Sequence, residues 1–211
     1  MTQEGIIKTV SSSQHEILAS IIHLYCPSGF DLDPTYSKGV FYRNGVPEPK
    51  YKADLTPQQD DVMPCDCRSL PFPDGFMSSI VFDPPFIGAS IKDGKTGIIK
   101  DRFSYFPNIP SLWKFYTESL SEFHRILTLN GILVFKCQDS VESGKQYITH
   151  TEVMNTAYKQ GFYTEDLFIL TVNTRLISPN QWKQQHARKY HSYFWVFRKV
   201  AKTLVGYPSL V

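Results

Sequence analysis

The tetrapeptide Asp83-Pro84-Pro85-Phe86 directly follows the short apolar run 79–82, and it combines an acid, two rigid residues and an aromatic ring. Two consecutive prolines remove two backbone N–H donors and fix two φ angles, so neither a helix nor a central strand can continue through them. The chain must therefore leave a buried strand abruptly and present the acid and the ring at its carboxyl end. In open α/β sheets, ligands bind at this end of the strands.

A carboxylate and a proline carbonyl at such a turn can each accept one hydrogen of an amino group attached to a purine or pyrimidine ring. That amine is a poor nucleophile because its lone pair is delocalised into the ring. Two rigid acceptors would pull the nitrogen toward tetrahedral geometry and localise the lone pair. Phe86 could stack on the base, a contact worth about 1–3 kcal/mol. An ordinary surface turn is the alternative for these four residues, so other segments must support the chemistry.

The acid-Pro-Pro-aromatic tetrapeptide resembles the active-site signature of the class I amino-methyltransferases that use S-adenosylmethionine. An aspartate at the first position is more typical of the adenine-N6 DNA methyltransferases, whereas a serine is more typical of the cytosine-N4 enzymes. The resemblance implies direct in-line transfer of the sulfonium methyl group, without a covalent enzyme intermediate. The catalytic residues that it implies are Asp83, Pro84, Pro85 and Phe86.

Three further segments resemble the cofactor-binding elements of this family, in the family's order. The segment 33–39 resembles the loop after the first strand, whose backbone N–H groups approach the methionine carboxylate; Ser37 stands where a glycine is usual. Asp54 lies where the family places an acid on the ribose, and Asp66 where an acid accepts a hydrogen bond from the adenine amino group. A turn-capping role is the alternative for Asp66. The implied cofactor-binding residues are Asp33, Pro34, Thr35, Lys38, Gly39, Asp54, Asp66 and Leu70.

Apolar periodicity predicts the elements that would position these residues. Helices are predicted over 14–25, where a serine of 11–13 can cap the first turn, over 112–127 and over 151–159. The pair Asn130-Gly131 is predicted to end the second helix, with Gly131 in the left-handed turn, in a helix-to-strand connection that also resembles the methyltransferases. Strands are predicted at 30–34, 51–53, 77–82, 132–137, 167–172 and 193–197, and a strand end followed by a turn is predicted within 63–72.

Strands that alternate with helices predict a mainly parallel sheet covered on both faces. The last two predicted strands have no helical pattern between them, which predicts an antiparallel pair at the end of the sheet. The predicted fold class is therefore α/β: a Rossmann-like class I methyltransferase with a seven-stranded sheet. We expect one domain over 1–211, in which 87–110 and 173–191 are substrate-facing loops.

Two basic segments would border the Asp83 turn in this topology. One spans 91–103, and the other, 182–193, interleaves basic groups with aromatic and amide side chains. Solvated basic loops are the alternative for both. A nucleic acid is the predicted partner, with DNA favoured over RNA, and modification inside a duplex would require flipping of the target base. The predicted contacts are Lys95, Arg102, Arg188, Lys189 and His191.

Composition agrees with these expectations but does not decide them. The formal net charge of +2 is too small to indicate nucleic-acid binding and is no obstacle to it. No apolar run approaches the roughly 18 residues of a membrane span, and 1–13 lacks the pattern of a secretory signal. The four cysteines form no CxxC pair and have no zinc-finger spacing. We therefore expect a cytoplasmic protein without a metal site and without a membrane partner.

The favoured prediction is an S-adenosyl-L-methionine-dependent methyltransferase that acts on adenine N6 in DNA. No segment is long enough for a separate target-recognition domain, so specificity would be local or lax, or would come from a specificity subunit or a homodimer. A ribosomal or transfer RNA base methyltransferase is the second prediction. The third is a non-catalytic binding module with the same fold, suggested by Ser37 in place of glycine.

Overall fold

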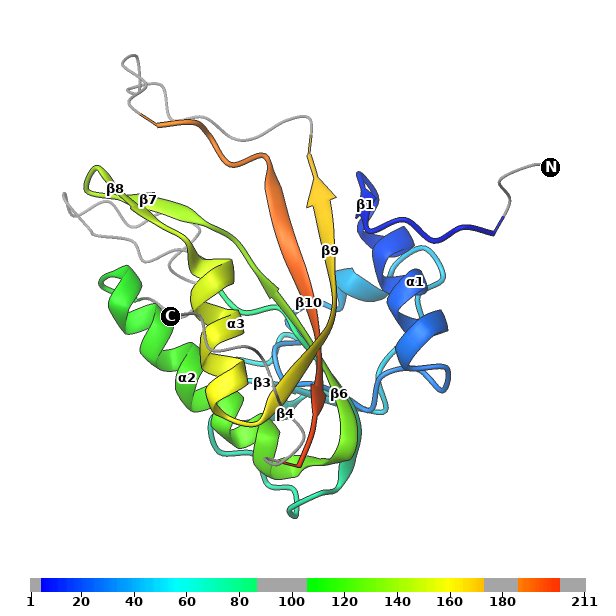
Figure 1. The fold of residues 1–211 in the computed structure, drawn as a ribbon. Coiled ribbons are helices and arrows are strands. Elements are labelled where there is room, and N and C mark those ends of the chain that lie inside the picture. Colours follow the sequence, from blue (N-terminus) through cyan, green and yellow to red (C-terminus); the bar gives the residue numbers. More distant parts are fainter. Residues whose placement is uncertain (1–4, 87–105, 173–185, 202–211) are drawn as a thin grey trace.

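The computed structural model describes residues 5–86, 106–172 and 186–201. These residues form a sheet with the strand order β1-β9-β10-β6-β5-β2-β3-β4 and a separate β7–β8 hairpin. Helix α1 lies on one side of the sheet, and α2 and α3 lie on the other (Figure 1). The helices are α1 (Gln14–Tyr25), α2 (Ile109–Ile126), α3 (Thr149–Lys159) and the 3-10 helix η1 (Val40–Tyr42). The strands are β1 (Val10–Ser11), β2 (Leu32–Asp33), β3 (Tyr51–Asp54), β4 (Met63–Pro64), β5 (Met77–Phe82), β6 (Leu127–Cys137), β7 (Ser140–Glu142), β8 (Lys145–Tyr147), β9 (Phe162–Thr171) and β10 (His191–Lys199).

The sheet is mainly parallel, as the sequence predicts. Strand β2 pairs in parallel with β3 and β5, β3 with β4, and β5 with β6. Strand β10 lies antiparallel between β6 and β9, which confirms the predicted terminal pair. The sheet has eight strands rather than the predicted seven, because the two-residue strand β1 adds to the edge beside β9. The β7–β8 hairpin was also not predicted.

Alternation along the central strands divides the core into two layers, because successive side chains of a strand point to opposite faces. Ile80 and Phe82 of β5 pack toward α2 and α3 together with Phe135 of β6. Val81 and Val134 pack toward α1 on the other face. The uninterrupted apolar runs of β5 and β6 are thus explained by burial on both sides.

Local caps decide where the helices begin. Helix α1 has the predicted bounds, and the Ser13 hydroxyl accepts the Glu16 N–H at its N-terminus. Helix α2 begins three residues before the predicted start, because the Asn108 side chain accepts the Ser111 N–H at 2.8 Å and a proline suits the first turn. Residues 109–110, predicted as the end of a loop, are therefore helical.

The predicted end of the second helix is wrong. Helix α2 stops at Ile126 and the chain enters β6 directly at Leu127. Asn130, not Gly131, takes the left-handed conformation, with φ +67°, where the register of β5 and β6 shifts. Asparagine is among the few residues that adopt this region readily. Gly131 has a different role, because a Cβ there would lie 3.0 Å from the Thr128 carbonyl oxygen.

None of the helices in the described ranges combines the length and apolar character needed to cross a bilayer.

Candidate active site

The order of the strands creates a switch point between β2 and β5. From β2 the chain continues to β3 and β4 on one side, and β5 then returns to the other side of β2. Ligands of open α/β sheets bind in the crevice outside the carboxyl ends of the strands at such a point. Asp33 ends β2 and Asp83 directly follows β5, so the fold brings the two predicted acids to this crevice. The Asp83 N–H donates to the Thr35 hydroxyl at 3.0 Å and joins the two turns.

The Asp83-Pro84-Pro85-Phe86 turn is fixed from α2. The Tyr116 hydroxyl donates to the Pro85 carbonyl at 2.5 Å, and only 2% of Tyr116 is exposed. The sequence does not predict this role for Tyr116. The signal in the sequence is that a polar aromatic residue stands on the apolar face of the helix. The hydroxyl occupies the second proline carbonyl and thus helps to hold the rigid turn in one orientation.

The Asp83 carboxylate forms an ion pair with Lys136 of β6. The Lys136 ammonium lies 3.3 Å from Oδ1 and 3.4 Å from Oδ2. Burial raises the pKa of Asp83, and the neighbouring ammonium opposes that rise. Oδ1 is buried without a hydrogen-bond partner among the described residues. Sequence reasoning missed Lys136, although a lysine inside a strand buried on both faces was a visible signal.

Asp33 is the most deeply buried acid of the site, with 2% of the residue exposed. Its Oδ1 accepts the Thr35 N–H at 2.8 Å, and its Oδ2 accepts the Tyr42 hydroxyl at 2.7 Å. Burial raises the pKa of Asp33 to about 7 against the effect of these hydrogen bonds, and the charge of Asp83 adds to the rise. Two neighbouring carboxyl groups with raised pKa values would favour a positively charged ligand.

The loop after β2 has the left-handed backbone conformation that the resemblance to the glycine-rich cofactor loop implies. Ser37 adopts a left-handed conformation with φ +51°, which explains why a glycine is usual at this position. Asp54, at the end of β3, accepts the Ser37 N–H at 2.9 Å, so its carboxylate holds the loop. A Cβ at Gly39 would lie 2.7 Å from a ring carbon of Tyr36. Of the other predicted loop residues, Pro34 is buried and Lys38 is exposed.

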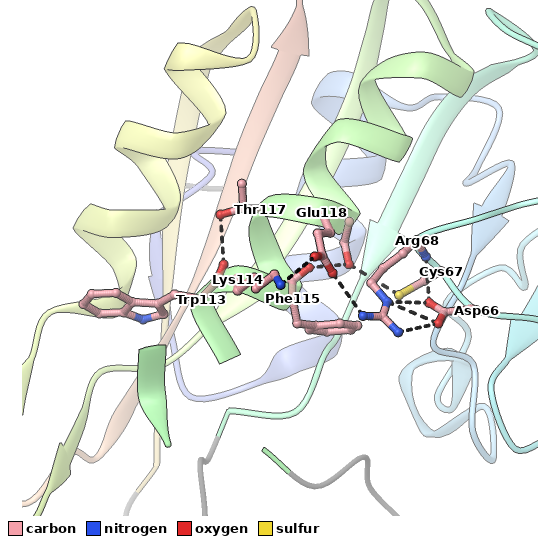
Figure 2. A network of polar contacts seen from close by, with 9 residues as sticks. Asp66, Cys67, Arg68, Trp113, Lys114, Phe115, Thr117 and Glu118 are labelled. Carbon is pink, nitrogen blue, oxygen red and sulfur yellow. Dashed lines mark hydrogen bonds and ion pairs between the residues drawn. The ribbon is translucent and has the colours of Figure 1, made fainter. Parts of the chain in front are cut away.

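Asp66 is engaged by a neighbouring arginine. Figure 2 shows the Arg68 guanidinium between the carboxylates of Asp66 and Glu118, at 2.7 Å and 3.0 Å. The Arg68 N–H also donates to Asp66, which is the turn-capping arrangement, and the Arg68 side chain lowers the pKa of Asp66. Leu70 is buried and its N–H donates to Glu122 at 2.7 Å. An adenine amino group at Asp66 would share the carboxylate with Arg68.

Comparison with solved structures identifies the fold. No protein-family model and no curated protein sequence matches the chain. TrmN from Thermus thermophilus aligns over 90% of this chain and 50% of that chain, with 14% identity and a TM-score of 0.51. A candidate methyltransferase in complex with the Haloferax volcanii Trm112 methyltransferase activator aligns over 89% and 90%, with 13% identity and a TM-score of 0.52. The fold is that of the class I methyltransferases.

The methyltransferase fold alone does not determine the reaction. The [4+2]-cyclase SpnF aligns over 88% of this chain and 80% of that chain, with 12% identity and a TM-score of 0.52. A candidate DNA modification methylase, TTHA0409 from Thermus thermophilus, in complex with S-adenosyl-L-methionine aligns with 20% identity and a TM-score of 0.46. This chain spans about half of that protein, with 69% of this chain aligned to 56% of the other.

The residues at the switch point of this methyltransferase fold suit S-adenosylmethionine chemically. The amino-acid end of the cofactor carries a sulfonium and an ammonium group, and Asp33 and Asp83 place two carboxyl groups in the crevice. Asp83 Oδ1 lies 3.3 Å from the Lys136 ammonium but has no hydrogen bond among the described residues, so it can accept one from a ligand. The crevice therefore offers negative charge and a hydrogen-bond acceptor to a positively charged cofactor.

The predicted nucleic-acid contacts are only partly described. His191 is the first residue of β10, and its Nε2 lies 2.9 Å from the Tyr193 hydroxyl. Arg188 and Lys189 precede β10 and are half-buried. Lys95 and Arg102 lie outside the described residues, as do 87–105 and 173–185 of the two predicted loops.

Proposed function

We propose that this protein is an S-adenosylmethionine-dependent methyltransferase that acts on the exocyclic amine of a nucleic-acid base, with adenine N6 in DNA as the favoured target. The observation that carries this proposal is the position of the Asp83-Pro84-Pro85-Phe86 turn at the switch point. The turn places a buried carboxylate oxygen, which faces the Lys136 ammonium but accepts no hydrogen bond among the described residues, beside the loop after β2. The aspartate at the first position is the reason for favouring adenine N6.

The cofactor would supply a methyl group on a positively charged sulfur. Asp33, Thr35 and the 36–39 loop would hold its amino-acid end, and Asp54 would support that loop through Ser37. Burial of two carboxyl groups is costly when both are ionised, and a bound cation would offset that cost. Binding of the cofactor should therefore favour the ionised form of Asp33.

The residues of the turn would prepare the amine for attack. Asp83 Oδ1 and the Pro84 carbonyl would each accept one N–H hydrogen, which localises the nitrogen lone pair, and Phe86 would stack on the base. Tyr116 occupies the Pro85 carbonyl and keeps the turn in place. The N–H that faces Asp83 is also the one whose proton can leave after methyl transfer, and burial raises the basicity of that carboxylate.

The test is methyl transfer from labelled S-adenosylmethionine to duplex DNA, single-stranded DNA and total RNA in parallel. The proposal expects N6-methyladenine in DNA, and a loss of about 100-fold or more in Asp83→Ala. Asp60→Ala is the matched control, because Asp60 is an exposed acid that is not part of the turn. Label confined to RNA would refute the DNA substrate and keep the chemistry. Cofactor binding without transfer to any nucleic acid would refute the base substrate, and absence of cofactor binding would refute the proposal as a whole.

A further inference from the structure

Lys136 is a buried lysine inside a central strand, which is a rare position for this residue type. It lies near the carboxyl end of β6, on the face that packs against α1, and 8% of the residue is exposed. Its ammonium donates to the Gln14 side-chain oxygen at 2.9 Å and pairs with the Asp83 carboxylate. Gln14 is the first residue of α1, so the ammonium links α1, β6 and the turn after β5.

Three aromatic rings surround the same ammonium. The Lys136 Nζ lies 4.7 Å from the ring centroid of Phe41, 5.3 Å from that of Phe86 and 5.4 Å from that of Phe194. Phe194 is the direct cross-strand partner of Lys136 in β10. Such distances allow cation–π attraction, which is strongest where water is excluded. A carboxylate, an amide oxygen and three ring faces together offset the cost of burying the charge.

Two of these partners belong to the Asp83-Pro84-Pro85-Phe86 turn. The ammonium meets Asp83 Oδ2 with hydrogen-bond geometry, whereas Oδ1 has no hydrogen-bond partner among the described residues. Both oxygens thus lie near the ammonium, at 3.3 Å and 3.4 Å, and Oδ1 keeps its capacity to accept a hydrogen bond from a ligand. The same ammonium attracts the Phe86 ring, the residue that would stack on the base.

We infer that Lys136 is a positioning residue for methyl transfer, which orients the Asp83 carboxylate and the Phe86 ring around the amine of the substrate. The inference rests on the proposed function and deepens it. The charge of Lys136 matters as well as its position. A carboxylate accepts hydrogen bonds only, whereas a protonated carboxyl group would direct a hydrogen toward the amine. The cation keeps Asp83 in the accepting form inside a buried site.

The charged and titratable groups around Asp83 predict the direction in which its pKa shifts when Lys136 is replaced. Lys136 faces it from β6, Asp33 from the end of β2, Tyr116 from α2 and Tyr42 from η1. Lys136 is the cation of this group and lowers the pKa of Asp83, and the charge of Asp83 in turn raises the pKa of Asp33. Removal of the ammonium should therefore raise the pKa of Asp83, and the acid limb of the rate profile should move to higher pH.

The experiment compares Lys136→Met with Lys136→Arg and with the matched control Lys159→Met. Methionine keeps an unbranched side chain that packs well against rings, arginine keeps the charge, and Lys159 is exposed at the end of α3. The first readout is the carboxyl titration of Asp83 by carbon NMR, assigned with Asp83→Asn, in protein without substrate or cofactor. The second is the pH profile of kcat and KM on the nucleic acid that the wild type methylates.

We expect a higher midpoint of the Asp83 titration in Lys136→Met than in the wild type and in Lys159→Met. The kcat of Lys136→Met should fall about 10- to 100-fold with a smaller change in KM, and Lys136→Arg should restore part of that kcat. If Lys136→Met does not fold, Lys136→Gln replaces it, because glutamine keeps a polar end without the charge and should move both readouts in the same direction. An unchanged midpoint, or a lower kcat without a shift of the acid limb, would overturn the inference. A wild type that methylates no nucleic acid would refute the proposed function instead, and the positioning role would fall with it.

Discussion

Asp33 should make the protein less stable as the pH rises toward neutrality. Burial raises its pKa in the folded protein from the ordinary value of 3.8 to about 7. Between about pH 4 and pH 7 the folded state therefore holds a proton that the unfolded chain has lost, and the free energy of unfolding falls as the pH rises through that window. The rise of the Asp33 pKa from 3.8 to about 7 corresponds to a loss of about 4 kcal/mol in the free energy of unfolding, as an upper bound.

Asp33→Asn removes this titration and can keep the local hydrogen bonds. The amide oxygen can accept the Thr35 N–H, and the amide nitrogen can donate to the Tyr42 hydroxyl oxygen, in place of the present bonds to Asp33. Relative to the wild type, the variant should gain about 2.5 kcal/mol in unfolding free energy between about pH 5 and about pH 8. Urea denaturation at a series of pH values measures this difference directly.

Asp31→Asn is the matched control, because Asp31 is a buried acid directly before β2 whose pKa shifts in the opposite direction. Burial alone would raise the pKa of Asp31, but the ion pair with Lys50 and the N–H groups of Ser78 and Ser79 lower it. Asp31 therefore adds stability above its unfolded pKa and loses it only as the pH falls further. Asp31→Asn should lower stability equally at about pH 5 and about pH 8. Parallel pH curves for the wild type and Asp33→Asn would refute the reasoning about Asp33.

Two further predictions concern the backbone of the site. Ser37→Gly should raise the free energy of unfolding by about 0.5–1 kcal/mol, because Ser37 holds φ +51°, and Ser37→Val should lower it; a lower thermal midpoint in Ser37→Gly would contradict this. Tyr116→Phe should cost about 1–3 kcal/mol in urea denaturation and reduce methyl transfer, because the Pro85 carbonyl loses its donor. Tyr25→Phe, which loses a hydrogen bond to Asp166 on another part of the sheet, should lower stability without reducing methyl transfer.

Local rules gave much of the fold from the sequence. Helical spacing and a serine cap located α1, and the apolar run before Asp83 located β5 with the observed bounds. The absence of helical periodicity between β9 and β10 predicted their antiparallel pairing. Predictions failed where two local signals competed, as at Asn130-Gly131. Either residue could take the left-handed turn, and the register between β5 and β6 selected Asn130.

The candidate site likewise has features that the sequence predicts and features that depend on packing. The sequence by itself determined the rigid turn at Asp83, because two prolines restrict the backbone whatever surrounds them. It also located acids at the ends of β2 and β3. The partners of these acids depend on strands and helices that are distant along the chain, and no spacing rule relates them.

Tertiary structure alone decided that Lys136 pairs with Asp83 and that Arg68 engages Asp66. It also decided that Asp33 is buried against Tyr42, which sets its ionisation. The physical reason is that sequence fixes which groups can ionise, while burial and neighbouring charges, both products of packing, fix which of them do.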